Sequence, residues 1–222
     1  QSLRELAKDL EDPRHPISYE RLQSYANQFI AHWRELSQQI GPEMADILAT
    51  ASDEQIAELV QNIDKRNKKF KTNYVDIPLE SLAEKRKERL TKDIKQWISR
   101  LTAEQKQAVS AWSDQITPLA ADGLRYRQRV LTEFQNLLTK QRQAPDFKEA
   151  FVALLVNFDQ MRTREYQQKI DINTDLTLKL LIKIDRSLNA TQRTYLLKRI
   201  GSMASDFDKL SCDPVQISPS VE

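Results

Sequence analysis

Few residues in this sequence could do acid–base, nucleophilic or metal chemistry. The two histidines, His15 and His32, lack a cysteine partner and a His-Glu-x-x-His spacing, so they do not predict a zinc site. An acidic pair such as Asp171 and Asp175 could meet a cation, but pairs of this kind are usually surface charge. The sequence also lacks a Gly-x-Ser-x-Gly turn, a phosphate-binding glycine loop and a dinucleotide fingerprint. We therefore predict a protein that is not an enzyme and has no catalytic residue, metal or cofactor.

The single cysteine, Cys212, cannot form a disulfide within the chain or a cysteine-based metal cluster. It lies in residues 211–222, which contain two prolines and several small polar residues. This composition predicts a disordered C-terminal tail.

Two related pentapeptides carry the clearest local motif, Leu-Thr-Ala-Glu-Gln at residues 101–105 and Leu-Asn-Ala-Thr-Gln at 188–192, with a looser third copy at 51–55. Each places a capping residue three positions before a glutamine, which is the spacing of a helix capping box. The leucines are expected to end the hydrophobic stripe of the preceding helix. A direct binding role is the alternative. The motif residues are Ser52, Gln55, Leu101, Thr102, Gln105, Leu188, Asn189 and Gln192.

Charge is unevenly distributed along the chain. Residues 1–63 hold 5 basic and 11 acidic side chains, whereas residues 64–100 hold 12 and 6. The basic segment could meet an anionic membrane, nucleic acid or an acidic partner, or it could be the solvated face of two helices. We favour a solvated face, because no nucleic-acid-binding motif accompanies it. Its candidate contact residues are Lys65, Arg66, Lys68, Lys69, Lys71, Lys85, Arg86, Lys87 and Arg89.

Composition predicts an all-α protein, because only 3 of the 222 residues are glycine and no period-two strand pattern is present. We expect extended antiparallel helical hairpins with short turns marked by proline, in a single domain over residues 1–210. The expected helices span residues 18–40, 43–49, 56–74, 78–101, 103–116, 123–144, 147–158, 160–187 and 190–210.

Three details of these helices are predicted as well. Apolar residues at steps of three and four, from Leu22 to Ile40, line one stripe of the first helix, which is expected to end at Gly41-Pro42. Asn67 occupies the apolar seam of a later helix. Arg86 interrupts another stripe, and we expect its stem to lie along the surface with the charge in water.

The leucine–threonine–glutamine motifs, in a charged helical chain poor in glycine, resemble those of the Spy and CpxP class of periplasmic proteins. A longer resemblance is to an uncharacterised family of Gram-negative envelope lipoproteins. It covers residues 18–210 and rests on Trp33-Arg34, on 51–55 leading into 65–70, and on 86–90 running to 101–105. It implies a helical body in the periplasm with an N-terminal lipid, whose signal is absent from this sequence.

The first functional hypothesis is a non-enzymatic periplasmic lipoprotein that binds protein partners or unfolded clients as a chaperone-like or scaffolding module. The alternative is an electrostatic binder of anionic membrane or nucleic acid through residues 64–100. Nucleic acid is the less favoured of these ligands.

Overall fold

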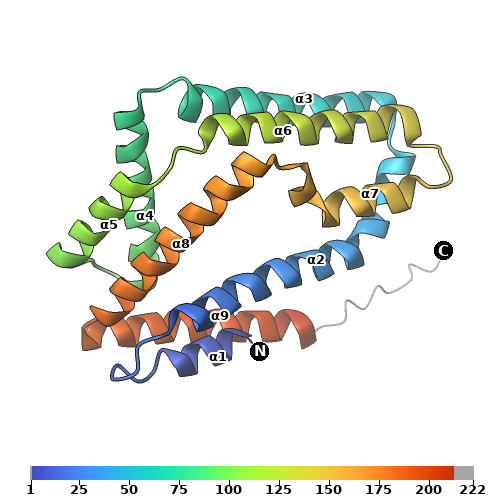
Figure 1. Ribbon diagram of the computed structural model, residues 1–222. Helices are drawn as coiled ribbons and strands as arrows, with labels where there is room; N and C mark the ends of the chain where they lie inside the picture. Colours follow the sequence, from blue (N-terminus) through green and yellow to red (C-terminus); the bar gives the residue numbers. More distant parts are fainter. Residues whose placement is uncertain (1, 213–222) are drawn as a thin grey trace. The chain divides into compact units, whose positions relative to one another are not determined.

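The computed structural model describes residues 2–212, and within them the chain is all-α, as the sequence predicts (Figure 1). No strand occurs in that part of the chain. Its α-helices are α1 (Ser2–Asp9), α2 (Tyr19–Thr50), α3 (Asp53–Phe70), α4 (Leu79–Ile98), α5 (Ala103–Gln115), α6 (Ala120–Asn136), α7 (Phe147–Val156), α8 (Arg164–Arg186) and α9 (Ala190–Cys212). Two π-helical turns, η1 (Lys71–Val75) and η2 (Leu137–Gln141), continue α3 and α6, and the 3₁₀ turn η3 (Phe158–Met161) follows α7.

The chain divides into two compact units, each built from separate stretches of sequence. Unit 1 consists of residues 1–25, 87–111 and 178–222, and unit 2 of residues 26–86 and 112–177. The prediction of a single domain over residues 1–210 stays a prediction, and each unit is described by itself below.

The core of unit 1 joins α1 to the end of α8 and to α9. Leu10, Ile17, Ile182 and Ile200 are buried together, and leucines from α1 and α9 pack around them. α1 was not expected from the sequence. It is a short helix that lies against α9, so its folding depends on this tertiary contact.

The core of unit 2 forms where α2, α3 and α7 meet η2, the π-helical turn that continues α6. Its buried members are Ala45, Ile56, Leu137, Leu138, Phe147 and Phe151. The Phe151 ring centroid lies 6.0 Å from that of Phe147, a tilted aromatic contact. In the same unit α3 and α6 lie side by side (Figure 1).

The expected break at Gly41-Pro42 is wrong, because α2 runs through both residues to Thr50. The glycine has a packing role instead: a Cβ atom at position 41 would lie 2.9 Å from Cγ2 of Val152 in α7. Gly41 therefore allows two helices to approach closely, and the two helices expected at 18–40 and 43–49 are one.

The Arg86 charge is less exposed than expected. Its side chain is partly buried, and Nη1 donates to the carbonyl oxygen of Ile116 at 3.1 Å. Burial lowers the pKa of Arg86. This contact joins α4 to the residue that follows α5.

Two other details concern chain ends. α9 extends through Ser211 and Cys212, two residues beyond the expected boundary. The rest of the predicted tail, 213–222, lies outside the described residues. At the end of α4, Ser99 adopts a left-handed conformation with φ of 70°, which turns the chain toward Leu101.

Candidate functional site

The three motif copies all form capping boxes. The pairs are Ser52 with Gln55, Thr102 with Gln105, and Asn189 with Gln192. At α5, the Thr102 backbone N donates to Gln105 Oε1 at 2.9 Å, and the Gln105 backbone N donates to Thr102 Oγ1 at 3.2 Å. The corresponding distances at α9 are 3.1 and 2.9 Å. Local spacing therefore suffices to explain the threonine, asparagine and glutamines of the motif.

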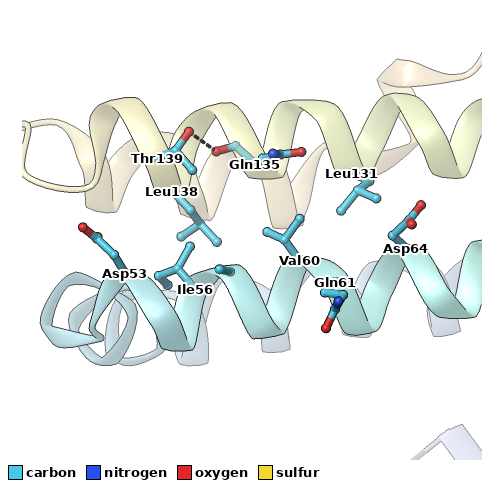
Figure 2. A pocket seen from close by; sticks show the side chains of 10 residues that line it. Asp53, Ile56, Val60, Gln61, Asp64, Leu131, Gln135, Leu138 and Thr139 are labelled. Atoms are coloured by element: carbon cyan, nitrogen blue, oxygen red, sulfur yellow. Dashed lines mark hydrogen bonds between the residues drawn. The ribbon is translucent and has the colours of Figure 1, made fainter.

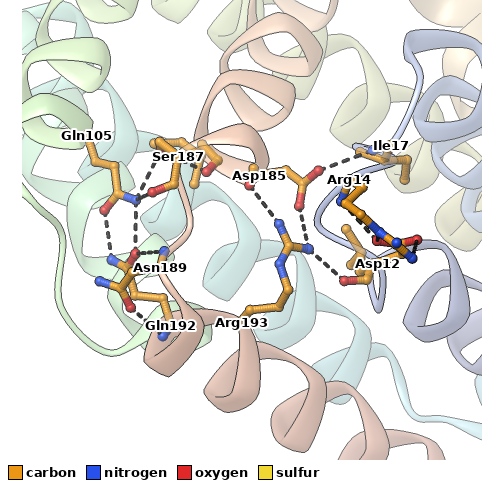
Figure 3. A network of polar contacts seen from close by, with 11 residues as sticks. Asp12, Arg14, Ile17, Gln105, Asp185, Ser187, Asn189, Gln192 and Arg193 are labelled. Carbon is orange, nitrogen blue, oxygen red and sulfur yellow. Dashed lines mark hydrogen bonds and ion pairs between the residues drawn. The ribbon is translucent and has the colours of Figure 1, made fainter.

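The boxes that start α5 and α9 also bind each other, which the sequence did not predict (Figure 3). Gln105 Nε2 donates to Gln192 Oε1 at 3.2 Å, and Gln192 Nε2 donates back to Gln105 Oε1 at 2.9 Å. Gln105 Nε2 also reaches the Ser187 carbonyl oxygen at 3.2 Å, and Gln192 Nε2 reaches that of Arg100 at 2.6 Å. Each glutamine thus contacts the turn that leads into the other box.

Burial shows that this glutamine pair lies inside unit 1. Gln105 is fully buried and Gln192 is 4% exposed. Every amide oxygen and nitrogen of the pair has a protein partner, so the arrangement holds two helix starts together. The alternative reading of the motif as a direct binding site stays a prediction, and it would require these buried bonds to break.

A buried ion pair lies beside the glutamines in Figure 3 and ties three parts of unit 1 together. Arg193 Nη1 lies 3.0 Å from Asp185 Oδ1 and donates to the Leu10 carbonyl oxygen at 2.6 Å. Asp185 Oδ2 accepts from the Ile17 backbone N at 3.1 Å. Neither charged residue belongs to a recognisable motif, so sequence reasoning missed them. Their role in this network is to hold the loop after α1 against α8 and α9.

The basic side chains of residues 64–100 make different kinds of contact. Lys68 pairs with Asp64 at 2.8 Å and Lys71 pairs with Asp76 at 2.9 Å, which places neutralising carboxylates within the segment. Lys85 donates to a backbone carbonyl, and the partly buried Arg86 donates to the Ile116 carbonyl as described above. The exposed basic side chains of α3 are Lys65, Arg66, Lys68 and Lys69. Lys87 and Arg89 belong to unit 1, whereas the others belong to unit 2.

A shallow groove follows the seam between α3 and α6, with a cavity volume of about 620 Å³ (Figure 2). Its floor is apolar, and the helices run antiparallel, since Ile56 faces Leu138 while Asp64 lies nearer Leu131. The rim carries Asp53, Gln61, Asp64, Gln135 and Thr139. Asp53 pairs with Arg142, and Asp64 pairs with Lys68. These contacts within the protein satisfy the two charges of the rim.

The surface of α2 in unit 2 carries a continuous apolar stripe that the described residues of unit 2 leave exposed. The stripe consists of Phe29, Trp33, Leu36, Ile40, Met44 and Ile47, with exposed fractions from 39% to 73%. An apolar stripe on an amphipathic helix normally faces a core. The side of α2 that is buried instead carries small residues, Ser37, Gly41 and Ala45. The stripe from Leu22 to Ile40 therefore packs inward only at its beginning, around Leu22 and Tyr25.

A second polar cluster connects α6 with α8 in unit 2. Asp122, in the first turn of α6, accepts from Lys169 Nζ at 2.7 Å and pairs with Arg125. The Lys169 hydrogen bond holds the pKa of Asp122 below its usual range, although burial opposes the shift. Asn173 of α8 also holds the segment before α6, since it bonds both the N–H and the carbonyl of Thr117, at 2.9 and 2.8 Å.

The histidines and aspartates first considered for catalysis or metal binding make separate local contacts. His15 contacts Asp12 at 3.0 Å, and Asp171 accepts from Gln167 at 2.7 Å. The described residues contain no group of three or more histidine, cysteine, aspartate or glutamate side chains arranged to hold a metal ion. Within residues 2–212 we also find no helix with the length and hydrophobicity needed to span a bilayer.

Comparison with known proteins gives a family. No curated protein and no solved structure matches the chain. Residues 2–167 match the model of the family of unknown function DUF6279, so the chain belongs to that family.

Proposed function

We propose that this chain is a non-enzymatic protein-binding module of the periplasm, which acts in a chaperone-like or scaffolding role. The observation that carries the proposal is the uncovered apolar stripe of α2. Six large apolar side chains in one line expose far more contiguous apolar surface than scattered single residues do, and such surfaces are typical of sites that bind other proteins.

The proposed location in the periplasm is a separate part of the proposal, and it rests on the resemblance to envelope lipoproteins. Membership of an uncharacterised family agrees with the coarser expectation from the sequence. The similarity to envelope lipoproteins, and the short motif shared with Spy and CpxP, support a lipid-anchored periplasmic protein. Metabolic labelling of the full-length protein with a fatty acid, followed by fractionation of the envelope, tests this part. Recovery of unlabelled protein outside the envelope would contradict it.

The binding role is tested by suppression of aggregation of a chemically denatured client. We expect the wild-type chain to suppress aggregation and the double variant Phe29→Asn/Ile47→Asn to lose most of this effect. Apolar contact drives such binding, so the effect should survive at high ionic strength. Leu79→Asn is the matched control, because Leu79 is a solitary exposed apolar residue on α4 and is 67% exposed.

The same assay separates the alternative function. An electrostatic binder would leave client aggregation unchanged. It would bind anionic vesicles or DNA only at low salt, and the combined change of Lys65, Lys68, Lys69 and Lys71 to Glu would abolish that binding. This result would replace our proposal with the alternative.

A further inference from the structure

The α2 stripe has a regular geometry that suits one kind of ligand. Its first and last members, Phe29 and Ile47, are 18 residues apart, which is five turns of an α-helix. The steps between members are 4, 3, 4, 4 and 3, so the stripe averages 3.6 residues per turn and runs parallel to the helix axis. It is about 27 Å long. A partner helix of five turns, with apolar residues at the same spacing, matches this stripe along its whole length.

The two flanks of the stripe differ. One flank is closed, because Gly41 packs against Val152 of α7, and because Arg34 on that side pairs with Asp159 at 2.6 Å. The other flank is exposed and consists of His32, Glu35, Gln39, Glu43 and Asp46. Helical geometry places these residues along one edge of the stripe. The open flank therefore has three carboxylates and no lysine or arginine.

Only one carboxylate of that flank has a neighbouring cation in α7. Asp46 pairs with Lys148 at 2.7 Å, and both side chains are largely exposed. Residues 26–50 contain one basic side chain, Arg34, against three acidic ones. A helix that docks on the stripe thus meets negative charge along one edge, which favours lysine or arginine beside its own apolar face.

We infer that the α2 stripe binds a basic amphipathic helix of another protein. The inference rests on the proposed protein-binding function and names its partner class. A second copy of this chain fits less well. In an antiparallel pair of α2 helices, the acidic flank of one copy would face the acidic flank of the other. In a parallel pair, the acidic flank of one copy would face the flank of the other copy that α7 already covers. An anionic membrane would meet the same carboxylates and be repelled.

Two synthetic peptides test the partner class directly. Both are 18-residue helices with the same apolar face, one flanked by lysine and the other by glutamate. Fluorescence anisotropy measures their affinity for the chain at 0.05 and 0.5 M salt. We expect the lysine peptide to bind about five- to tenfold more tightly at low salt, with the difference shrinking at high salt. The double variant Glu35→Lys/Glu43→Lys should reverse the preference.

The matched control is Glu58→Lys/Glu133→Lys, which changes the net charge equally with exposed glutamates of α3 and α6. It should keep the preference of the wild-type chain. Equal binding of both peptides, or a preference that the control changes as much as the α2 variant does, would overturn the inference. If neither peptide binds while Phe29→Asn/Ile47→Asn still abolishes client protection, the partner class is wrong but the proposed function stands.

Three further outcomes name a different occupant, and each would overturn the inference. A dimer of the wild-type chain that Phe29→Asn/Ile47→Asn dissociates, measured by sedimentation, would show that a second copy covers the stripe. Binding to anionic phosphatidylglycerol vesicles that the same variant abolishes would show a membrane surface. A large loss of stability in the variant would show that the stripe is covered within the chain itself.

Discussion

Gln105 combines two roles, as half of a capping box and as a member of the buried pair with Gln192. Gln105→Ala removes the acceptor of the Thr102 N–H and the donor to Ser187, and it leaves the Gln192 amide with unmet bonds. Buried groups without partners are costly, so we expect the free energy of unfolding to fall by about 3 kcal/mol in urea melts.

The matched control is Gln55→Ala, since Gln55 forms the same capping bond in an exposed box that lacks a pairing partner. It should cost no more than about 1 kcal/mol. We also expect Gln105→Ala to cost more than Thr102→Ala. This order is opposite to the one expected for an isolated box, in which glutamine supplies only the reciprocal bond. Equal effects at Gln55 and Gln105 would show that the pair adds nothing to stability.

Ser99 offers a stabilising substitution at the same turn. Its φ of 70° is a left-handed conformation, which costs a residue with a Cβ atom about 1–2 kcal/mol. Glycine adopts it freely but loses more entropy on folding. We expect Ser99→Gly to raise the free energy of unfolding by about 0.5–1 kcal/mol, measured by urea melts. A decrease would show that the Ser99 side chain has a stabilising role of its own.

Sequence reasoning at the residue scale succeeds where the partners are neighbours in the chain. The bond between Thr102 and Gln105 spans three residues, so spacing alone predicts it. The bond between Gln105 and Gln192 spans 87 residues and depends on the path of the whole chain. Gln55 has the same capping spacing as these two glutamines, and the local difference is Ala51 where the paired boxes have Leu101 and Leu188. That leucine does not reveal which boxes pair, because the pairing joins distant parts of the chain.

At the scale of elements, Gly41 decides how closely α2 and α7 approach. In Gly41→Ala the new methyl would lie 2.9 Å from Cγ2 of Val152, a branched side chain that has little freedom to move. Overpacking of this kind costs about 1–3 kcal/mol, whereas alanine gains up to about 1 kcal/mol in helix propensity. We expect a net loss of stability in thermal or urea melts.

Gly201→Ala in α9 is the control for Gly41→Ala. A Cβ atom there meets nothing within 4 Å, so only the propensity gain of about 1 kcal/mol remains and the variant should be more stable. Val152→Ala should relieve the clash, so that the double variant Gly41→Ala/Val152→Ala loses less than the sum of the two single changes. Additive losses would contradict the proposed contact.

Apart from α1, which was not expected, helix positions were predictable to within a few residues, because apolar periodicity and most proline positions are local signals. The α2 helix shows the limit of this reasoning. Gly-Pro usually ends a helix, but at Gly41-Pro42 the packing of α7 overrides the local preference. Periodicity also located an apolar stripe correctly without showing that most of it stays uncovered, since burial depends on which other elements lie nearby.

At the scale of the whole molecule, each unit holds a carboxylate whose pKa is depressed in the folded state. In unit 2 this is Asp122, as described above. In unit 1, burial raises the pKa of Asp9, but hydrogen bonds from Arg21 at 2.6 Å and Tyr25 at 2.7 Å outweigh it and bring it below its usual range. Tyr25 responds in the opposite direction, since burial and Asp9 raise its pKa to about 12.

These shifts predict that acid destabilises both units. A carboxylate with a depressed folded-state pKa contributes its full stability above the unfolded value, about 3.9 for aspartate, and loses it as the pH falls toward the lower folded value. We therefore expect the free energy of unfolding to be nearly constant from about pH 5.5 to 7 and to decline below about pH 4.5.

Asp122→Asn should lower the free energy of unfolding by about 1–2 kcal/mol at pH 7 and make the acid decline shallower. Urea melts across this pH range measure both effects. Asp93→Asn, at an exposed position of α4, is the control for the loss of a single carboxylate. An unaltered acid decline in Asp122→Asn would show that the Lys169 contact does not couple folding to protonation.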